Sequence, residues 1–229
     1  MKSNARRFVS IVAVGLWLAM PLNRAFADDS ILERLTAQWW QWALSVPTPV
    51  NPLTDQTGED CVIGQRGSTW FLTGIFGGGT VARTCSVPQG KTLFFPIINS
   101  VNLNTPNVCG QDANNIPVAD LRAFSASFID GATNLSVKLD GKQVKKLPRR
   151  VQSQVFELAL PEDNVFDPLC DPLNVPAGIY SPAVDDGFYM MLEPLKTGNH
   201  TLQFHAENPS QGFVEDVTYN ITVVPVSLR

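Results

Sequence analysis

The chain has 229 residues, of which 17 are Lys or Arg and 21 are Asp or Glu, giving a formal net charge of −4. This length suits one well-buried domain better than two. The acidic balance argues against a protein that follows a nucleic-acid backbone or binds an anionic membrane surface.

Residues 1–27 have the features of a secretory signal peptide. A basic start leads into the apolar run FVSIVAVGLWLAM, and Ala25 and Ala27 place small residues before a cleavage site. The apolar run is shorter than the roughly 20 residues of a membrane-spanning helix. We therefore expect cleavage after Ala27, a periplasmic or secreted protein, and no membrane span in the mature chain.

An amphipathic helix is expected from Ser30 to about residue 45. Ser30 and Glu33 have the S-x-x-E form of a capping box, and Pro47 disfavours helical geometry at the residue before it. The apolar residues of this segment form one stripe on a helical wheel: Ile31, Leu32, Leu35, Trp39, Trp42 and Ala43. Trp40 lies about 100° from Trp39, on the shoulder of the stripe. It is the tryptophan that we expect to remain free for recognition.

The rest of the chain has the pattern of a β protein. Residues 28–56 are expected to form the helix and an extended strap, and residues 57–229 one β-sandwich domain. Apolar runs, alternating patterns and turn signals predict strands at 68–76, 80–87, 91–99, 134–139, 142–147, 151–160, 186–195, 198–206 and 213–224, with one short inserted helix at 117–130. Many short strands with few helices favour an antiparallel β-sandwich of immunoglobulin-like or jelly-roll type.

The four cysteines are Cys61, Cys85, Cys109 and Cys170. An even number in an exported protein predicts two disulfides, although four cysteines allow three pairings. Pairing of nearest neighbours, Cys61 with Cys85 and Cys109 with Cys170, is favoured because it joins short segments that are expected to be adjacent.

Two stretches resemble a group of uncharacterised exported bacterial proteins. They are TGEDCVIGQRGSTWFLTGIFGGGTVARTCSVPQGKTLFFPIIN, residues 57–99, and DGFYMMLEPLKTGNHTLQF, residues 186–204. The resemblance covers about a third of the mature chain. It implies export through the Sec route in a bacterium and a sandwich fold, and it carries over no activity and no site residues.

Carboxyl groups supply the weak catalytic candidates. Glu59 and Asp60 stand beside a cysteine that could hold them in place, and Asp186 opens a predicted strand. A pair of carboxylates could hydrolyse a glycosidic bond. The alternative function is therefore a secreted polysaccharide hydrolase or lyase.

A calcium site is a further hypothesis. Pairing of Cys109 with Cys170 would bring two loops rich in Asp and Asn together, with Asp112, Asp167 and Asp171 near the bridge. Calcium binds six to eight oxygen ligands of this kind. No other cofactor is expected.

The leading hypothesis is a non-enzymatic binding protein. Its partner would be a carbohydrate, a cell-surface component or another protein, and Trp40, Trp70 and Phe188 would supply flat apolar contacts. A structural or assembly subunit is a third alternative, in which the N-terminal helix docks onto a partner.

Overall fold

The structure, a computed structural model, describes residues 22–170 and 174–226. Most of the predicted signal peptide, residues 1–21, lies outside the described residues. Asp171, one of the predicted calcium ligands, also lies outside them.

The strands form two five-stranded sheets. The first sheet contains β1 (Thr69–Phe71), β3 (Thr92–Leu103), β8 (Gly178–Leu192) and β6 (Arg149–Gln152) in that order, and β7 (Phe156–Leu160) also pairs with β8. The second sheet has the order β2 (Gly79–Pro88), β10 (Phe213–Val224), β9 (Gly198–Asn208), β4 (Thr133–Leu139) and β5 (Lys142–Gln143). The two-sheet, mainly β architecture agrees with the predicted sandwich.

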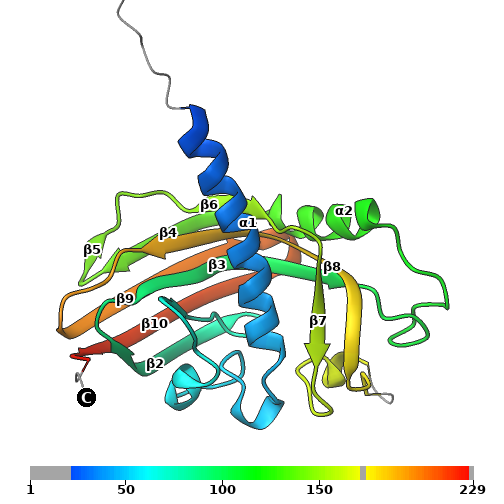
Figure 1. Cartoon of the computed structure of the whole chain (residues 1–229), viewed down its shortest axis with the longest axis horizontal. Helices are drawn as coiled ribbons and strands as arrows, with labels where there is room; N and C mark the ends of the chain where they lie inside the picture. Colours follow the sequence, from blue (N-terminus) through cyan, green and yellow to red (C-terminus); the bar gives the residue numbers. More distant parts are fainter. Residues whose placement is uncertain (1–21, 171–173, 227–229) are drawn as a thin grey trace, which may run out of the picture.

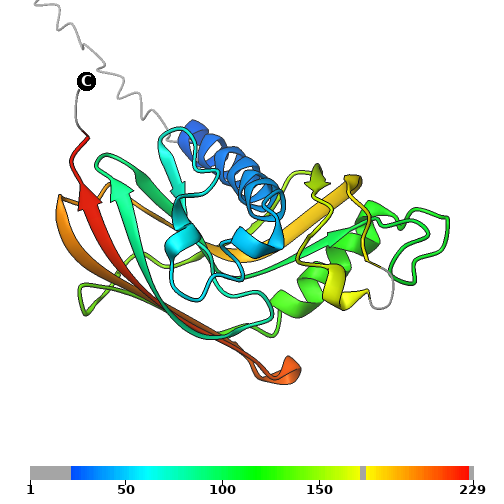
Figure 2. The same ribbon diagram turned by 90° about the horizontal axis from the view of Figure 1, so that it is seen from below.

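The molecule has three layers, with the first sheet in the middle. Helix α1 (Leu22–Leu44) crosses one face of the first sheet, and the strands β9 and β10 lie on the other side (Figures 1 and 2). One core lies between the two sheets and includes Phe95 and Phe204, whereas a second core lies under α1 and includes Trp39 and Phe94. Helix α2 (Val118–Ile129) contributes Ile129 to the core between the sheets.

The second sheet follows from the sequence pattern of its strands. In β9 the alternate residues Leu202, Phe204 and Ala206 are buried, as they are in a strand with one face on the core. The Asp140-Gly141 turn joins β4 to β5, and both residues have positive φ, as a tight hairpin turn requires. The inserted helix and these strands are confirmed.

The sheets are mixed rather than purely antiparallel. β1 pairs with β3 in parallel over three residues, and β2 pairs with β10 in parallel along its whole length. The remaining ladders are antiparallel. The antiparallel prediction is therefore wrong for these two edge strands, because local alternation does not encode strand direction.

Three predicted strands are shorter than expected or divided. The run at 142–147 forms a strand only at Lys142–Gln143. The run at 68–76 gives a strand only up to Phe71, because the following carbonyl groups bond to side chains instead of a ladder. Leu72 O accepts from Trp39 Nε1 at 2.9 Å, and Gly74 O accepts from the Arg83 guanidinium at 2.9 Å. The run at 151–160 is divided into β6 and β7 around Ser153, whose hydroxyl accepts a hydrogen bond from the Asp185 N–H.

Helix α1 begins earlier than the capping box predicted. It runs from Leu22, so Ser30 lies within the helix and is not its first residue. The predicted start at Ser30 is wrong because the residues from Leu22 onward are already helical. Trp39 and Trp42 are buried anchors, as predicted. Among the described residues, no helix combines the length and apolar character that crossing a membrane requires.

Both favoured disulfides are present. Cys61 pairs with Cys85 and Cys109 with Cys170, and no described cysteine is free. Two disulfides indicate an oxidising compartment such as the periplasm or the cell exterior. The first bridge ties the short 3₁₀ helix η2 (Glu59–Val62) to β2, and Thr84 N donates to Thr57 O at 2.7 Å beside it.

We expect loss of the Cys61–Cys85 bridge to lower the free energy of unfolding by about 3–4 kcal/mol, because the unfolded chain gains loop entropy. The double variant Cys61→Ala/Cys85→Ala would show this in urea unfolding without reductant. Cys109→Ala/Cys170→Ala, which opens a longer loop of 61 rather than 24 residues, should lose slightly more. Unchanged urea midpoints in both variants would contradict the expectation.

Candidate ligand-binding cleft

An open cleft of about 420 Å³ lies at the edge of the first sheet, where β1 has ended and β3 continues. We call it the sheet-edge cleft. Its walls are mainly aromatic and aliphatic. They come from α1, the strap after α1, the loop after β1, β3, α2, β10, and the 3₁₀ helix η3 (Asp167–Leu169) with the residue before it: Trp39, Trp40, Leu53, Ile75, Phe76, Val101, Phe128, Phe166, Leu169 and Phe213. Its polar side chains are those of Asn99, Ser100 and Glu215.

Glu215 places a carboxyl group inside this apolar lining. Its side chain is 5 % exposed, and Oε1 accepts the Ile75 N–H at 2.7 Å. Burial raises the pKa of Glu215 to about 8, against the opposing effects of the Ile75 hydrogen bond and the Arg83 charge. The carboxyl group is therefore mostly protonated at neutral pH and can donate a hydrogen bond into the cleft.

Gly74 is required for this placement. A Cβ atom at residue 74 would lie 1.5 Å from Glu215 Oε1. The absence of a side chain allows the carboxyl group to lie directly against the backbone of the loop after β1. Any larger residue at 74 would push Glu215 or the loop away.

Arg83 holds the same loop from the second sheet. Its Nη1 donates to Thr73 O, Gly74 O and the Tyr219 hydroxyl, each at 2.9 Å, and its Nε donates to Asp55 O at 2.7 Å. The guanidinium also lies 5.6 Å from the centre of the Tyr219 ring. Arg83 is 1 % exposed, so a permanent charge is buried among neutral acceptors.

A second buried acid lies behind the cleft. Asp185 Oδ1 accepts from Trp40 Nε1 at 2.7 Å and from the Tyr189 hydroxyl at 2.8 Å, and Asn99 Nδ2 donates to that hydroxyl at 3.0 Å. Burial raises the pKa of Asp185 to about 8, although the bonds from Trp40 and Tyr189 lower it. Oδ2 has no hydrogen-bond partner among the described residues, since the nearby Thr36 hydroxyl donates to Glu33 O.

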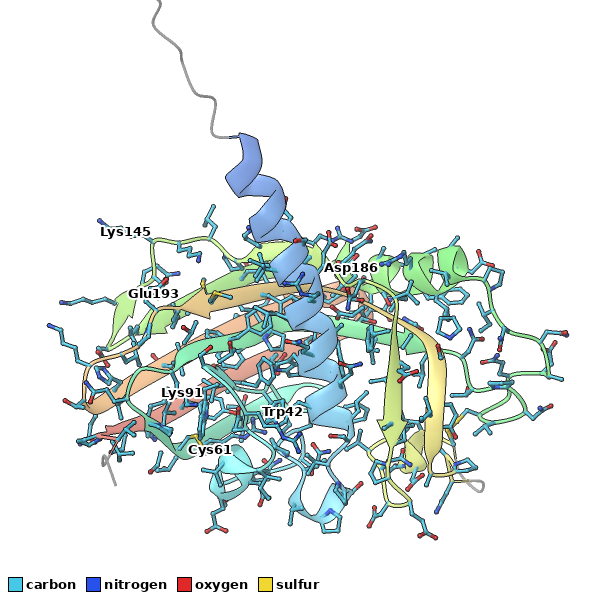
Figure 3. All side chains as sticks on the ribbon, in the orientation of Figure 1. Trp42, Cys61, Lys91, Lys145, Asp186 and Glu193 are labelled. Carbon is cyan, nitrogen blue, oxygen red and sulfur yellow. A yellow bond between two sulfur atoms is a disulfide. The ribbon has the colours of Figure 1, made fainter. Side chains whose placement is uncertain are left out.

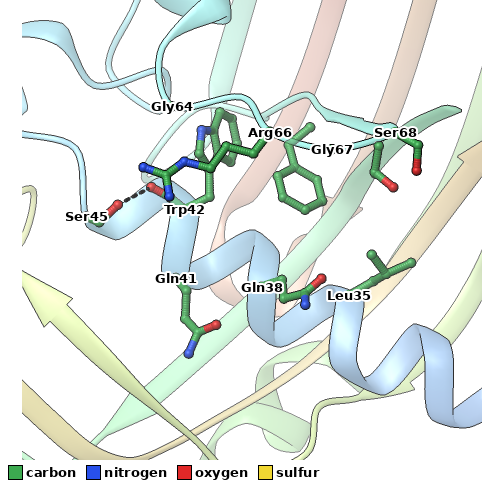
Figure 4. A pocket seen from close by; sticks show the side chains of 11 residues that line it. Leu35, Gln38, Gln41, Trp42, Ser45, Gly64, Arg66, Gly67 and Ser68 are labelled. Carbon is green, nitrogen blue, oxygen red and sulfur yellow. Dashed lines mark hydrogen bonds between the residues drawn. The ribbon is translucent and has the colours of Figure 1, made fainter. Parts of the chain in front are cut away.

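A second hollow, of about 640 Å³, runs along α1 (Figure 4). We call it the helix groove. Leu35, Gln38 and Gln41 of α1 form one side, and Arg66 and Ser68 of the loop before β1 lie opposite. Trp42 and Phe71 also line it. The groove is larger than the sheet-edge cleft, but it contains no buried titratable group.

The structure places the predicted recognition aromatics inside the protein. Trp40 is 4 % exposed, so the prediction that it projects freely is wrong: its indole N–H is drawn inward by Asp185. It nevertheless lines the sheet-edge cleft. Trp70 is buried, and Phe188 is half-buried and packs against the core between the sheets. Neither lines the cleft or the groove.

The predicted catalytic carboxylates do not come together. Figure 3 shows Asp186 beside α2 and Cys61 at the opposite end of the sheet, so Glu59 and Asp60 of η2 are remote from Asp186. Asp60 N donates to Asp55 Oδ2, within a turn that Asp55 organises. Asp186 is buried in an ion pair with Arg150, at 2.9 Å. These contacts give Asp60 and Asp186 positions in the framework, whereas Glu59 is exposed.

The predicted calcium ligands have structural partners. Asp167 accepts the Asn164 and Val175 N–H groups, one on each carboxyl oxygen, and Asp112 accepts the Asn114 N–H. Within the described ranges, no group of three or more His, Cys, Asp or Glu side chains is arranged to hold a metal ion. The calcium hypothesis stays a prediction, because Asp171 is not described.

Arg83 and Glu215 were not singled out from the sequence, although a signal was present. In TVARTCSV, Arg83 falls in the same alternating set as Val81 and Cys85, which face the core. In FVEDVTYN, Glu215 lies two residues before Val217 and four before Tyr219, so it falls on the same inward-facing side of the strand. A charged residue at an inward position of a regular strand indicates a buried polar site.

No protein-family model, curated protein or solved structure matches this chain. The function is therefore inferred from the two hollows and the groups that line them.

The buried acids predict a pH dependence of stability. An acid whose pKa is higher in the folded protein binds its proton more tightly there, so the free energy of unfolding falls as pH rises from about 4 to about 8. Asp185→Asn should remove part of this slope, at most about 1.4 kcal/mol per pH unit for one group. Urea unfolding at several pH values would measure the slope.

The exposed Glu162→Gln serves as a control and should keep the wild-type slope. The slope is the informative quantity, since Asp185→Asn can also change stability at every pH. If Asp185→Asn has the same slope as wild type between pH 5 and 7, Asp185 does not titrate as described.

Proposed function

We propose that this chain is an exported, non-enzymatic β-sandwich protein that binds a ligand or partner in the sheet-edge cleft. One observation carries the proposal: a buried carboxyl group, that of Glu215, lies in the aromatic lining of an open cleft. Ligand sites commonly combine an apolar concave surface with a few polar groups and a perturbed titratable residue. Export is supported by the N-terminal sequence pattern and by the two disulfides.

The lining defines the chemistry of the ligand. Its apolar body would contact the aromatic walls, where Phe128 and Phe213 meet edge to face with ring centres 5.4 Å apart. Its polar part would meet the Glu215 carboxyl group, the Asn99 side-chain oxygen and the Ser100 hydroxyl. Asn99 Oδ1 and Ser100 Oγ make no hydrogen bond with another described residue. They are therefore available to a bound molecule.

The hydrolase alternative requires two acids in one site. Glu215 is the single carboxyl group that lines the sheet-edge cleft among the described residues, and the described lining of the helix groove contains none. Asp185 is buried behind the cleft and not in its lining. A binding role therefore fits these two hollows better than general acid and base catalysis by a carboxylate pair.

The helix groove supports a second candidate, carbohydrate binding. Its floor is apolar, while Gln38, Arg66 and Ser68 have exposed side chains that make no hydrogen bond with the described chain. Sugars present apolar faces and a ring of hydroxyl groups, which amide, guanidinium and hydroxyl groups can bind. This surface is the one that would serve the predicted carbohydrate partner.

A neutral solvatochromic dye such as Nile red tests the sheet-edge cleft. We expect saturable binding to the mature chain, and about tenfold weaker binding to Phe128→Ala, because removing a phenyl group from the lining costs on the order of 1.5 kcal/mol. Phe124→Ala is a matched control, since Phe124 lies one turn away on α2, is 53 % exposed and does not line the cleft. Equal dye affinity in both variants would contradict the proposal.

Calorimetric titration with cello-, chito- and malto-oligosaccharides tests the helix groove. A bound oligosaccharide should lose at least about fivefold in affinity in Gln38→Ala/Arg66→Ala, because each removed group costs about 0.5–1.5 kcal/mol of hydrogen bonding. Arg34→Ala, an exposed change elsewhere on α1, should have no effect. If none of these sugars binds, the carbohydrate candidate fails for these classes.

A further inference from the structure

Within the described chain, one edge of β3 is unpaired over most of its length. β8 pairs with one edge of β3 from Leu93 to Leu103, whereas β1 covers the other edge only from Thr92 to Phe94. The described chain makes no other backbone hydrogen bond to this second edge between Phe95 and Leu103. A strand edge of this kind presents a row of N–H and C=O groups ready to pair with another strand.

The sheet-edge cleft runs along this free edge. Asn99, Ser100 and Val101 line it, and a smaller hollow of about 190 Å³ continues along Val101, Asn102 and Leu103. Successive side chains of a strand point to opposite faces of the sheet, so a hollow over one face would meet only alternate residues. Lining by consecutive residues places both hollows beside the strand. They share Phe166 and Leu169, which form the opposite wall.

The register identifies the groups that face the hollows. Phe94 O accepts Leu72 N–H, so Phe94 directs its backbone to the free edge. The bulge between Pro96 and Ile98 adds one residue and reverses the alternation. Beyond the bulge, the backbone groups of Asn99, Val101 and Leu103 therefore face outward.

We propose that the ligand of the sheet-edge cleft is a polypeptide segment in extended conformation, which adds a strand to the free edge of β3. This inference rests on the proposed binding function and names the class of its ligand. The outward N–H and C=O groups of β3 would pair with the backbone of the segment, as in other cases of strand addition. The unpaired N–H and C=O groups of a strand edge can pair with the backbone of another polypeptide. A lipid or an aromatic metabolite has no matching row of donors and acceptors, so a peptide fits this edge better.

The walls would then select side chains. Alternate residues of the added strand would point toward the cluster of Phe76, Phe128, Phe166 and Phe213, which favours large apolar residues. Glu215 would offer its protonated carboxyl group from the same wall as Phe213. We therefore expect preference for an apolar side chain at every second position of the segment.

A fluorescein-labelled, end-blocked peptide that alternates valine and threonine would test the inference, with the mature chain as the binding protein. The supporting result is saturable binding together with slower hydrogen exchange, by at least about tenfold, at the amides of Asn99, Val101 and Leu103. The amides of Ile98, Ser100 and Asn102 face β8 and should change little. The same peptide with every backbone amide N-methylated should not bind, because it has no N–H to donate.

Two matched variants locate the site. Leu169→Lys puts a charge on the wall of the hollow, at a side chain that is 69 % exposed, and should weaken peptide binding about tenfold. Leu147→Lys changes a side chain that is 79 % exposed and does not line either hollow, and it should bind the peptide like wild type. Equal effects of the two variants would overturn the proposal.

The outcomes also separate this inference from the binding function on which it rests. If Nile red binds in the cleft but the peptide does not protect the three outward amides, the peptide inference is wrong and the binding function stands. If neither probe binds, both are wrong. If the protein alone is a dimer with those amides already protected, the occupant of the edge is a second copy of the chain, and the peptide proposal is overturned.

Discussion

The guanidinium of Arg83 is the contact on which the cleft depends. A buried arginine cannot lose its charge, so every donor that it carries needs an acceptor from the surrounding fold. The chain supplies carbonyl oxygens to Nε and Nη1 from two segments: Asp55 in the strap after α1, and Thr73 and Gly74 after β1. Nη2 is buried and has no hydrogen-bond partner among the described residues. Arg83 therefore fastens the irregular segment that ends β1. Beyond Phe94, the edge of β3 that β1 covers has no paired strand among the described residues, whereas β8 pairs with the other edge.

The buried carboxyl group of Glu215 is a consequence of the same arrangement. Arg83 draws the backbone of residues 73 and 74 inward, and Gly74 lets the Glu215 side chain approach that backbone. The Arg83 charge lowers the pKa of Glu215, yet burial has the larger effect. The charged guanidinium of Arg83 therefore lies near the carboxyl group of Glu215, which is mostly neutral and is not an ionised partner for it. Strongly shifted pKa values of buried carboxyl groups occur both in structural networks and at functional sites.

The parts of the fold that could be predicted are those that depend on residues close together in the sequence. Alternation gave β9 and β10, the Asp140-Gly141 turn gave a hairpin, and spacing favoured the correct partners for Cys61 and Cys109. Strand direction was not predictable, because the parallel pairing of β2 with β10 joins residues that are remote in the sequence. The end of β1 was missed because side chains, not a ladder, satisfy the carbonyl groups after Phe71.

The candidate site was harder to predict than the fold. Its walls come from seven parts of the chain, and the longest run of consecutive lining residues is the four from Gly74 to Gly77. The position of Trp40 on the shoulder of the stripe predicts exposure, whereas Asp185 accepts its indole N–H inside the protein. A tryptophan on the shoulder of a helical stripe can be buried when the opposite surface offers an acceptor for its N–H.

The three indole groups of α1 also determine when the helix can take its place. Trp42, Trp39 and Trp40 donate to partners that follow by 21, 33 and 145 residues in the sequence. The last contact cannot form until β8 has been synthesised and has joined the sheet. Contacts of such long range slow folding, because a large loop must close before they contribute. The core under α1 therefore stays incomplete until residues from the last third of the chain are in place.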